Sequence, residues 1–390
     1  MKNLETLIQE LCPDGVEFVK LGECCTFKRG TTITAKNAIA GDVPVLAGGQ
    51  KPAYYHNVSN RTGETIVVAG SGAYAGYVSY WTIPVFLSDS FSVQPDNRLV
   101  TKFVYYFLKN IQQKIFATKK GSGVPHVHGS SIAKFEIPLP PIEVQTEIVR
   151  ILDKFTSLEA ELEAELDCRK RQYEYYRDKL LSFDNMGGQE VEWKKMSEVF
   201  DMKNGYTPSK AKAEYWEGGT IPWFRMEDIR ENGRILSDSI QHITMEGVKK
   251  GKLFPANSFI LATTATIGEH ALVIADSLAN QRFTNLTVRK SLSDRLLIKF
   301  VFHYMFIVDE WCKKNINVSG FASVDMNKFK KLEFPIPSLE EQHRIVNILD
   351  RFESLTTSLQ SGLPAEITAR RQQYEHYRDK LLTFKRKGAA

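Results

Sequence analysis

The chain is poor in the features that mark several large classes of protein. Its 390 residues include five cysteines, with no Cys-x-x-Cys pair and no histidine at metal-ligand spacing, so we expect neither a zinc site nor a disulfide framework. No run of about 18 apolar residues is present, and the first five residues, Met-Lys-Asn-Leu-Glu, lack the apolar core of a signal peptide. We therefore expect a cytosolic globular protein that is neither secreted nor membrane-spanning. The cysteines are Cys12, Cys24, Cys25, Cys168 and Cys312.

Sequence signatures of catalysis are also missing. The chain has no Gly-Lys-Ser/Thr phosphate loop and no Asn-Pro-Pro-Tyr or Asp-Pro-Pro-Tyr methyltransferase tetrapeptide. The glycine-rich segment 70–76 lacks the third-glycine spacing of a dinucleotide-binding loop, so it predicts a tight turn. His126 and His128 have no third ligand nearby, which favours a polar loop contact over a metal site. We expect no catalytic residue and no bound metal or cofactor in this chain.

An internal repeat dominates the sequence instead. The segment 138–155, which begins Pro-Leu-Pro-Pro-Ile-Glu, returns at 335–352 with an offset of 197 residues. A second block, 173–183, reads Tyr-Glu-Tyr-Tyr-Arg-Asp-Lys-Leu-Leu-Ser-Phe and returns at 374–384 with an offset of 201. The duplication predicts internal pseudo-two-fold character, which suits a partner that is itself two-fold, such as duplex DNA.

Both copies of the repeat have a helical apolar pattern. The first copy predicts one mostly helical segment over 142–183, roughly 60 Å long at 1.5 Å per residue. The second copy gains a four-residue step at Gly362-Leu363-Pro364, which predicts two helical segments because proline interrupts a helix or starts a new one. Packing the two apolar stripes on each other would bury both, in antiparallel or in parallel pairing. The stripes are Phe155, Leu158, Leu162, Leu166, Tyr173, Tyr176 and Leu180, and Phe352, Leu355, Leu359, Leu363, Ile367, Tyr374, Tyr377 and Leu381.

Between the repeated blocks lie two globular regions of mixed helix and strand pattern. In the first we expect strands at 65–69 and 78–81 and a helix at 102–118. In the second we expect strands at 258–262 and 271–274 and a helix at 296–313. The predicted fold class is thus mixed α/β, with two globular domains separated by two long helical regions. The predicted domains are residues 1–137 and 188–334, and the helical regions are 138–187 and 335–390.

The repeated blocks resemble the specificity subunit of type I restriction-modification systems over essentially the whole chain. The resemblance rests on the proline-rich start, on Glu-Gln-x-x-Ile-Val-x-x-Leu-Asp-x-Phe at 341–352, where Val144 replaces Glu341 in the first copy, and on the twofold Tyr-Arg-Asp-Lys-Leu-Leu block. It implies two target recognition domains that each read half of a bipartite, asymmetric DNA sequence. It also implies an antiparallel helical spacer that docks two modification (methyltransferase) subunits, with restriction subunits joining later. S-adenosylmethionine, ATP and magnesium would belong to those partners, inside a bacterial or archaeal cytoplasm.

A short repeat inside the first helix sharpens this resemblance. Residues 158–166 contain the unit Leu-Glu-Ala-Glu twice, similar to the family's spacer repeat, whose copy number sets the gap between half-sites. Four helical residues add about 6 Å, or one to two base-pair steps. The alternative is a solvated helix of high propensity with no ruler function.

Candidate DNA contacts recur at matching positions in the two halves. The net charge of +5 permits an anionic partner, and basic or hydroxyl groups beside a glycine are common phosphate contacts. Each could equally be a solvated turn, and individual base-reading roles are weaker expectations than core or surface roles. The candidates are Lys28, Arg29, Thr31, Gln50, Lys51, Tyr74, Lys119 and Lys120 in the first half, and Lys203, Asn204, Tyr206, Arg225, Thr263, Thr264, Arg282, Lys313 and Lys314 in the second.

Subunit docking is expected on the repeated helices, although a solvated helix face would also explain their polar residues. A rival interpretation is a coiled-coil scaffold whose duplicated domains bind proteins, and a third is an unrecognised nuclease or methyltransferase. A scaffold would bind DNA with little dependence on salt, and an enzyme would turn over with magnesium or a methyl donor. The docking candidates are Gln145, Tyr173, Tyr176, Arg177, Gln342, Tyr374, Tyr377 and Arg378.

Overall fold

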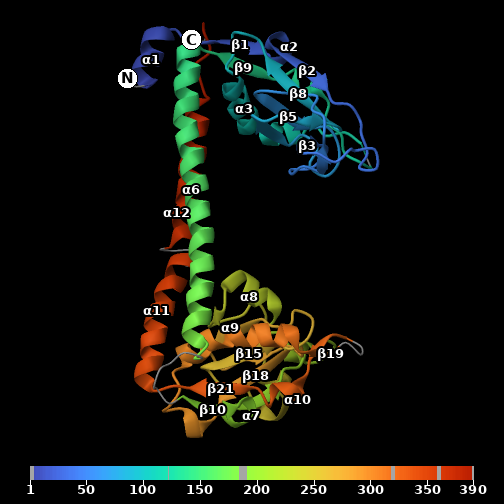
Figure 1. Ribbon diagram of the computed structural model, residues 1–390. Helices are drawn as coiled ribbons and strands as arrows, with labels where there is room; N and C mark the ends of the chain where they lie inside the picture. Colours follow the sequence, from blue (N-terminus) through green and yellow to red (C-terminus); the bar gives the residue numbers. More distant parts are fainter. Residues whose placement is uncertain (1–3, 122, 184–190, 318–320, 358–361, 389–390) are drawn as a thin grey trace. The chain divides into compact units, whose positions relative to one another are not determined.

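The computed structural model describes residues 4–121, 123–183, 191–317, 321–357 and 362–388. These form two compact units, unit 1 with residues 1–164 and 365–390, and unit 2 with residues 165–364. Each unit combines a sheet-rich domain with segments of long helix (Figure 1). The mixed α/β fold class predicted from the sequence is confirmed. Within the described residues, no helix is both long and apolar enough to cross a membrane.

The domain of unit 1 is built on a four-stranded antiparallel sheet and two smaller sheets. The four-stranded sheet has the order β2 (Cys25–Arg29), β8 (Ser90–Pro95), β5 (Thr65–Ala69) and β6 (Val78–Trp81). The three-stranded sheet has the order β4 (Tyr54–His56), β3 (Val43–Leu46) and β7 (Phe86–Leu87). The last pairs β1 (Glu17–Lys20) with β9 (Glu136–Leu139). Strands β5 and β6 are the two that the sequence predicts.

Helices pack beside these sheets to close the core of unit 1. The predicted helix over 102–118 is interrupted at Ile111, so that α3 (Thr101–Asn110) is followed by α4 (Gln112–Phe116). Here Gln112 accepts a hydrogen bond from the backbone N–H of Val78 at 3.1 Å and donates to the carbonyl of Gly76 at 2.7 Å. The helix is therefore broken next to the residue, Gln112, that is hydrogen-bonded to the β5–β6 turn. The other short helices are α1 (Leu4–Leu11), α2 (Leu21–Cys24) and α5 (Gly129–Ile132).

The domain of unit 2 repeats this plan with additions. Its main sheet has the order β11 (Phe200–Asn204), β18 (Phe283–Val288), β15 (Ser258–Ala262), β16 (His270–Val273) and β13 (Ile235–Leu236). Its three-stranded sheet has the order β14 (His242–Ile243), β12 (Ile221–Phe224) and β17 (Leu278–Ala279). Two pairs complete it, β10 (Glu192–Lys195) with β21 (Glu333–Ile336) and β19 (Ile316–Asn317) with β20 (Ser323–Val324). Strand β13 has no counterpart among the described residues of unit 1. The β19–β20 pair corresponds there to a single antiparallel bridge between Lys120 and His126.

The helices of unit 2 follow the same order along the chain. The predicted helix over 296–313 is confirmed as α9 (Ile298–Lys314), the counterpart of α3. Its core side chains pack with those of the main sheet and of α11. The α-helices of the domain are α7 (Met196–Val199), α8 (Met226–Asn232), α9 and α10 (Met326–Phe329), and the 3-10 turns are Ala213–Tyr215, Met245–Gly247, Lys249–Gly251 and Lys290–Leu292.

The long helices match the sequence prediction closely. The first copy of the repeat forms one 40-residue helix, α6 (Ile142–Leu181), and the second forms α11 (Leu339–Thr357) and α12 (Leu363–Leu381). Helix α6 gives its residues up to 164 to unit 1 and the rest to unit 2. The stripe residue Leu359 lies outside the described residues.

Helix pairing is antiparallel within each unit. In unit 1 the ring of Phe155 stacks on Tyr377 at 5.4 Å, whereas Arg371, earlier on α12, forms ion pairs with Glu159 and Glu163, later on α6. In unit 2 Tyr176 of α6 stacks on Phe352 of α11 at 5.6 Å. These two aromatic pairs come from equivalent positions of the repeat with the helices exchanged. Of the two pairings left open by the sequence, the antiparallel one is therefore correct.

Candidate nucleic-acid interface

In unit 1 a sharp turn at the end of β2 exposes three predicted DNA contacts. The N–H of Gly30 donates to the carbonyl of Ser90 at 2.8 Å, and that of Thr31 to the carbonyl of Leu87 at 2.9 Å. A Cβ on Gly30 would lie 2.2 Å from the Leu87 carbonyl oxygen, so only glycine permits this close approach. Lys28, Arg29 and Thr31 are all exposed beside it.

Three loops of unit 1 meet next to this turn. The N–H of Gly70 donates to the carbonyl of Asp89 at 3.0 Å, and that of Val127 to the carbonyl of Gly70 at 2.9 Å. Lys119 donates to the carbonyl of Ala73 at 3.2 Å. The glycine-rich segment is thus the tight turn predicted from the sequence, held against the loop that carries the two lysines.

The remaining unit 1 candidates border the same place. Tyr74 is 48% exposed at the tip of the turn. A Cβ on Gly48 would lie 2.2 Å from the carbonyl oxygen of Ser71, which places the loop carrying exposed Gln50 and Lys51 against the turn. Fold topology therefore brings the predicted segments together. The unit 1 candidates gathered here are Lys28, Arg29, Thr31, Gln50, Lys51, Tyr74, Lys119 and Lys120.

A polar cavity of about 280 Å³ opens among these loops. Arg29, His126, His128 and Ser130 line it, and the two imidazole rings stack at 6.4 Å. The guanidinium of Arg29 lies 3.5 Å from the carboxylate of Asp89, and both groups are substantially exposed. Such an exposed pair contributes little to stability, so the arginine remains available to another anion.

Unit 2 presents the same turn with different chemistry. A Cβ on Gly205 would lie 2.2 Å from the carbonyl oxygen of Asn280, which repeats the glycine requirement of unit 1. Lys203 is exposed, whereas Asn204 accepts a hydrogen bond from the hydroxyl of Thr284 at 3.1 Å. The hydroxyl of Tyr206 accepts from the backbone N–H of Lys249 at 2.6 Å, so its hydrogen-bonding capacity is partly used within the chain.

Burial argues against the prediction that Thr263 reads DNA. Its side chain is 7% exposed, and its hydroxyl lies 3.2 Å from the hydroxyl of Thr284 inside the main sheet. Thr264, the next residue, is half-buried and bridges to Ser323 of the β19–β20 pair. A buried hydroxyl satisfied inside the domain cannot reach a base edge.

The other basic candidates of unit 2 lie at two places. Arg225 and Arg282 line a cavity of about 330 Å³ together with Lys210. Lys313 and Lys314 are exposed at the end of α9, where Lys313 forms an ion pair with Glu310 at 2.6 Å. The predicted loop continues through residues 318–320, which, like Ser122 of the unit 1 loop, lie outside the described residues.

Burial also argues against the prediction that Gln145 and Gln342 dock a partner subunit, because both side chains are fully buried. The side-chain oxygen of Gln145 accepts from the N–H of Val100 at 2.8 Å, and its amide donates to the carbonyls of Arg98 at 2.9 Å and Pro140 at 2.8 Å. Gln342 makes the same three bonds to the corresponding backbone groups of 297, 295 and 337, at 2.9, 2.8 and 2.8 Å. Each glutamine therefore ties a long helix to the start of α3 or α9.

Arginines of the repeated block also face their own unit. Arg177 lies over the rings of Tyr173 and Phe306 at 5.7 and 5.0 Å, and its side chain is 12% exposed. Arg378 lies over Tyr374 at 5.6 Å with its side chain 18% exposed. Burial raises the pKa of the Tyr374 hydroxyl. These four residues of the docking set are mostly occupied by intramolecular packing.

Two tyrosines of the docking set are partly exposed to solvent. Tyr176 and Tyr377 are each 37% exposed, although both stack on a phenylalanine of the partner helix. In unit 2 a hollow of about 610 Å³ adjoins Tyr176 and is lined also by Leu180, Ile348 and Phe352. Among the predicted docking residues, these tyrosines are the ones that a partner could reach.

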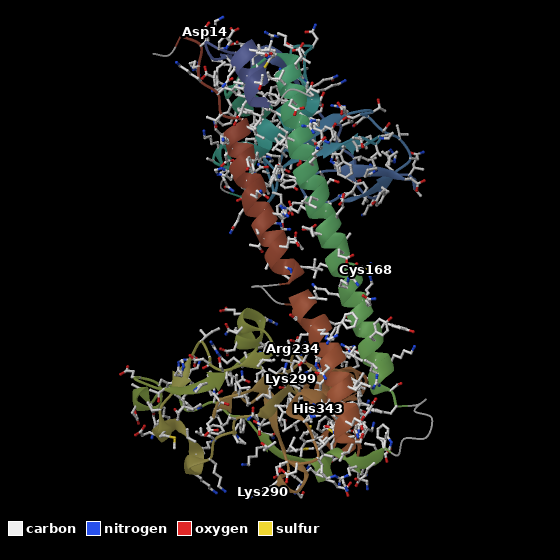
Figure 2. All side chains as sticks on the ribbon, turned by 90° about the vertical axis from the view of Figure 1, so that its left-hand side faces the viewer. Asp14, Cys168, Arg234, Lys290, Lys299 and His343 are labelled. Carbon is white, nitrogen blue, oxygen red and sulfur yellow. The ribbon has the colours of Figure 1, made fainter. Side chains whose placement is uncertain are left out.

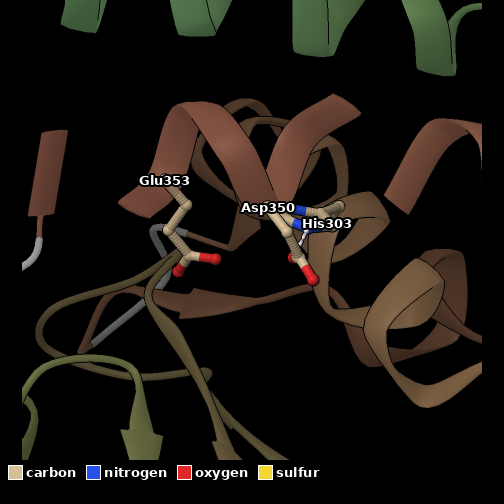
Figure 3. Close-up of side chains that lie close together, drawn as sticks. All are labelled: His303, Asp350 and Glu353. Atoms are coloured by element: carbon tan, nitrogen blue, oxygen red, sulfur yellow. Dashed lines mark hydrogen bonds and ion pairs between the residues drawn. The ribbon is translucent and has the colours of Figure 1, made fainter. Parts of the chain in front are cut away.

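An ionic cluster that the sequence interpretation missed occurs once in each unit. In unit 1 Asp153 accepts from Lys102 at 2.8 Å and from the hydroxyl of Tyr106 at 2.5 Å. In unit 2 the equivalent Asp350 accepts from His303 at 2.8 Å (Figure 3) and lies 3.5 Å from Lys299. The sequence contains a signal for this cluster. Lys299, His303 and Asp350 each lie 197 residues after Lys102, Tyr106 and Asp153.

Of the described residues, only His303, Asp350 and Glu353 group their ligand atoms closely enough to hold a metal ion. Figure 3 shows the three side chains, with Asp350 and Glu353 on α11 and His303 on α9. Lys299 lies within 3.5 Å of the Asp350 carboxylate and 3.9 Å of the Glu353 carboxylate. Lys299 thus already pairs with both carboxylates, which makes the group an ion-pair network.

Comparisons with known proteins agree with this architecture. Residues 13–167 and 189–369 match the family described as "Type I restriction modification DNA specificity domain". The chain is 34% identical over 413 aligned residues to the EcoR124I/EcoR124II specificity subunit of a type I restriction enzyme from Escherichia coli, covering 98% of this chain and 97% of that protein. It is 55% identical over 207 residues to the EcoprrI specificity subunit, also from Escherichia coli, covering 51% of this chain and 52% of that protein.

Solved structures support the fold. A type I restriction-modification S subunit from M. genitalium aligns with a TM-score of 0.57 at 17% identity, covering 94% of this chain and 96% of that one. A chain from work on complex assembly and conformational transition of the type I R-M system aligns with a TM-score of 0.61 at 18% identity, covering 95% and 98%. Identities this low are informative about architecture alone.

Proposed function

Because this chain belongs to the type I restriction-modification DNA specificity family and is the DNA specificity subunit of such a system, we propose that it directs its complex to a bipartite, asymmetric duplex sequence. The domain within residues 1–137 would read one half-site, and the domain within 188–334 the other. Lys28 and Lys203 would contact phosphates, since each is exposed at the same point of an equivalent turn.

One observation carries the proposal: equivalent positions of the two domains have different side chains. The residue after β3 is Ala47, and the residue after the matching strand β12 is Arg225. Two residues beyond β7 stands Asp89, and two residues beyond β17 stands Gln281. Two domains that share a strand framework but differ in their loop side chains are suited to reading two different sequences.

The duplicated helices supply the support for partner subunits in this proposal. Tyr176 and Tyr377 occupy equivalent positions of the repeat, one in each unit, and both are partly exposed. An equivalent patch in each unit would accept two copies of one partner, the modification subunit. Restriction subunits would join the same complex. S-adenosylmethionine, ATP and magnesium would be bound by those partners, and this chain would contribute specificity.

The test is to co-express this chain with the neighbouring candidate methyltransferase and to map methylated bases in the host DNA. We expect one asymmetric bipartite motif that is lost when this chain is deleted. Unchanged methylation, with assembly of the complex shown independently, would overturn the proposal. Salt titration of DNA binding adds a second readout, because phosphate contacts give a steep dependence that a protein-binding scaffold would lack.

A further inference from the structure

Arg225 of unit 2 has a buried hydrogen-bond donor that is not satisfied within the described residues. It follows β12 and faces a cavity of about 330 Å³, with Lys210 and Arg282 also in the lining. Its Nε atom is buried and, among the described residues, has no hydrogen-bond partner. A buried donor without an acceptor is costly and calls for an explanation, and one explanation is an acceptor that a bound ligand supplies.

Two acids lie near Arg225, Glu227 in the lining of the same cavity and Asp228, and among the described residues neither forms an ion pair with its guanidinium. Asp228 is fully buried, and its two carboxylate oxygens accept from the backbone N–H groups of Arg225 and Ile240, both at 2.6 Å. Other arginines of the unit have ion pairs, such as Arg289 with Asp201 at 3.2 Å. Within the described part of the chain, neither Arg225 nor Arg282 has a carboxylate within 4 Å of its guanidinium nitrogens.

The surroundings fix the orientation of the free guanidinium. It lies over the indole of Trp223 at 5.8 Å, which favours a stacked, planar arrangement. The side chains of Thr207 and Gln281 hydrogen-bond to each other at 2.5 Å in the same cavity lining. An oriented guanidinium offers two parallel N–H donors, and its best neutral partner on duplex DNA is the O6/N7 edge of guanine in the major groove.

We propose that Arg225 reads a guanine in the half-site of the second domain, as a specificity-determining residue, with Lys210 and Arg282 holding the flanking phosphates. The inference rests on the proposed DNA-reading function. Because the equivalent position in unit 1 is Ala47, the contact belongs to one half-site only. Loss of a bidentate arginine–guanine contact corresponds to roughly a 5- to 140-fold loss of discrimination.

The experiment compares the wild-type complex with the methyltransferase against Arg225→Ala, Arg225→Lys and the control Arg230→Ala, an exposed arginine on α8. First, the methylated motif of each complex is mapped in host DNA. Second, binding is measured to duplexes that carry the wild-type motif, with each guanine of the second half-site replaced in turn by 7-deazaguanine or adenine. Arg225→Ala is expected to fold, because its guanidinium makes no hydrogen bond to a described residue.

We expect Arg225→Ala and Arg225→Lys to relax one guanine position of that half-site and to leave the other half-site unchanged. At that position the variants should ignore the guanine replacements that weaken wild-type binding, while Arg230→Ala keeps the wild-type pattern. If both Arg225 variants keep full guanine discrimination, or if Arg225→Lys restores wild-type binding as a phosphate contact would, the inference is overturned. A wild-type complex that yields no bipartite motif would instead reject the proposed function itself.

Discussion

Nε2 of His303 lies 2.8 Å from Oδ1 of Asp350, in a position where the first unit places the hydroxyl of Tyr106 against Asp153. The pKa of Asp350 is lowered, first by this hydrogen bond and further by the charge of Lys299. A carboxyl whose pKa is lower in the folded state stabilises the fold above its unfolded value of about 3.9. That contribution is lost as the pH falls through the folded pKa.

We therefore predict that, in Asp350→Asn, the free energy of unfolding of unit 2 falls less steeply as the pH drops below about 4. Tryptophan fluorescence of a Trp81→Phe background can follow this unit, because the other four of the five tryptophans lie within residues 165–364. Asp153→Asn in unit 1 is the matched control, and it should leave the fluorescence-detected acid transition in place. If Asp350→Asn unfolds in acid as the wild type does, the aspartate is not coupled to folding of this unit.

The buried glutamines give a prediction that separates structure from docking. Gln145→Ala removes three hydrogen bonds and leaves backbone groups of Val100, Arg98 and Pro140 unpaired. We expect a loss on the order of 3 kcal/mol in the free energy of unfolding of unit 1. Gln145→Glu should also destabilise, since a carboxylate cannot donate to the two carbonyls. Chemical denaturation measures both variants.

Gln342→Ala is the matched change in unit 2, where the side chain of Gln342 makes the equivalent three bonds to the backbone of residues 295, 297 and 337. Its destabilisation should be confined to the fluorescence transition of that unit. Normal stability of either glutamine variant, combined with lost capture of the methyltransferase, would restore the docking role that burial argues against.

The two glutamines show a limit of prediction from the sequence. The repeat offset identifies them, because duplication preserves their spacing, but it does not distinguish a buried structural residue from an exposed docking residue. The same limit applies to Thr263: its position just after a predicted strand is right, whereas the burial of its hydroxyl depends on Thr284 of another strand. Periodicity predicts helices α6, α9, α11 and α12 well, since apolar spacing is a local property.

The features that the sequence did not predict depend on contacts between segments that are far apart in the chain. The gathering of the unit 1 loops depends on backbone bonds such as Val127 to Gly70, whose partners are far apart in the chain. The unpartnered guanidinium of Arg225 likewise depends on Asp228 being satisfied by backbone N–H groups. Such properties arise from tertiary contacts, and composition or spacing alone does not determine them.

Salt dependence tests the two basic turns. If Lys28 and Lys203 each contact a phosphate, then Lys28→Ala and Lys203→Ala should each reduce the slope of log K against log salt by about 0.9 and weaken binding to all duplexes alike. Lys290→Ala is the control, because that exposed lysine lies in a 3-10 turn away from β11 in sequence and outside the candidate set (Figure 2). An unchanged slope for a turn variant would remove that lysine from the interface.

The exposed tyrosines give the last prediction, which concerns stoichiometry. If Tyr176 and Tyr377 each help to seat one modification subunit, Tyr377→Ala should cost the complex one of two such subunits, and native mass spectrometry would count them. Tyr377→Phe is the matched control, because it keeps the ring that stacks on Phe155 at 5.4 Å. The combined Tyr176→Ala, Tyr377→Ala chain should bind neither copy while each unit stays folded. Retention of two subunits by the double variant would show that docking uses another surface.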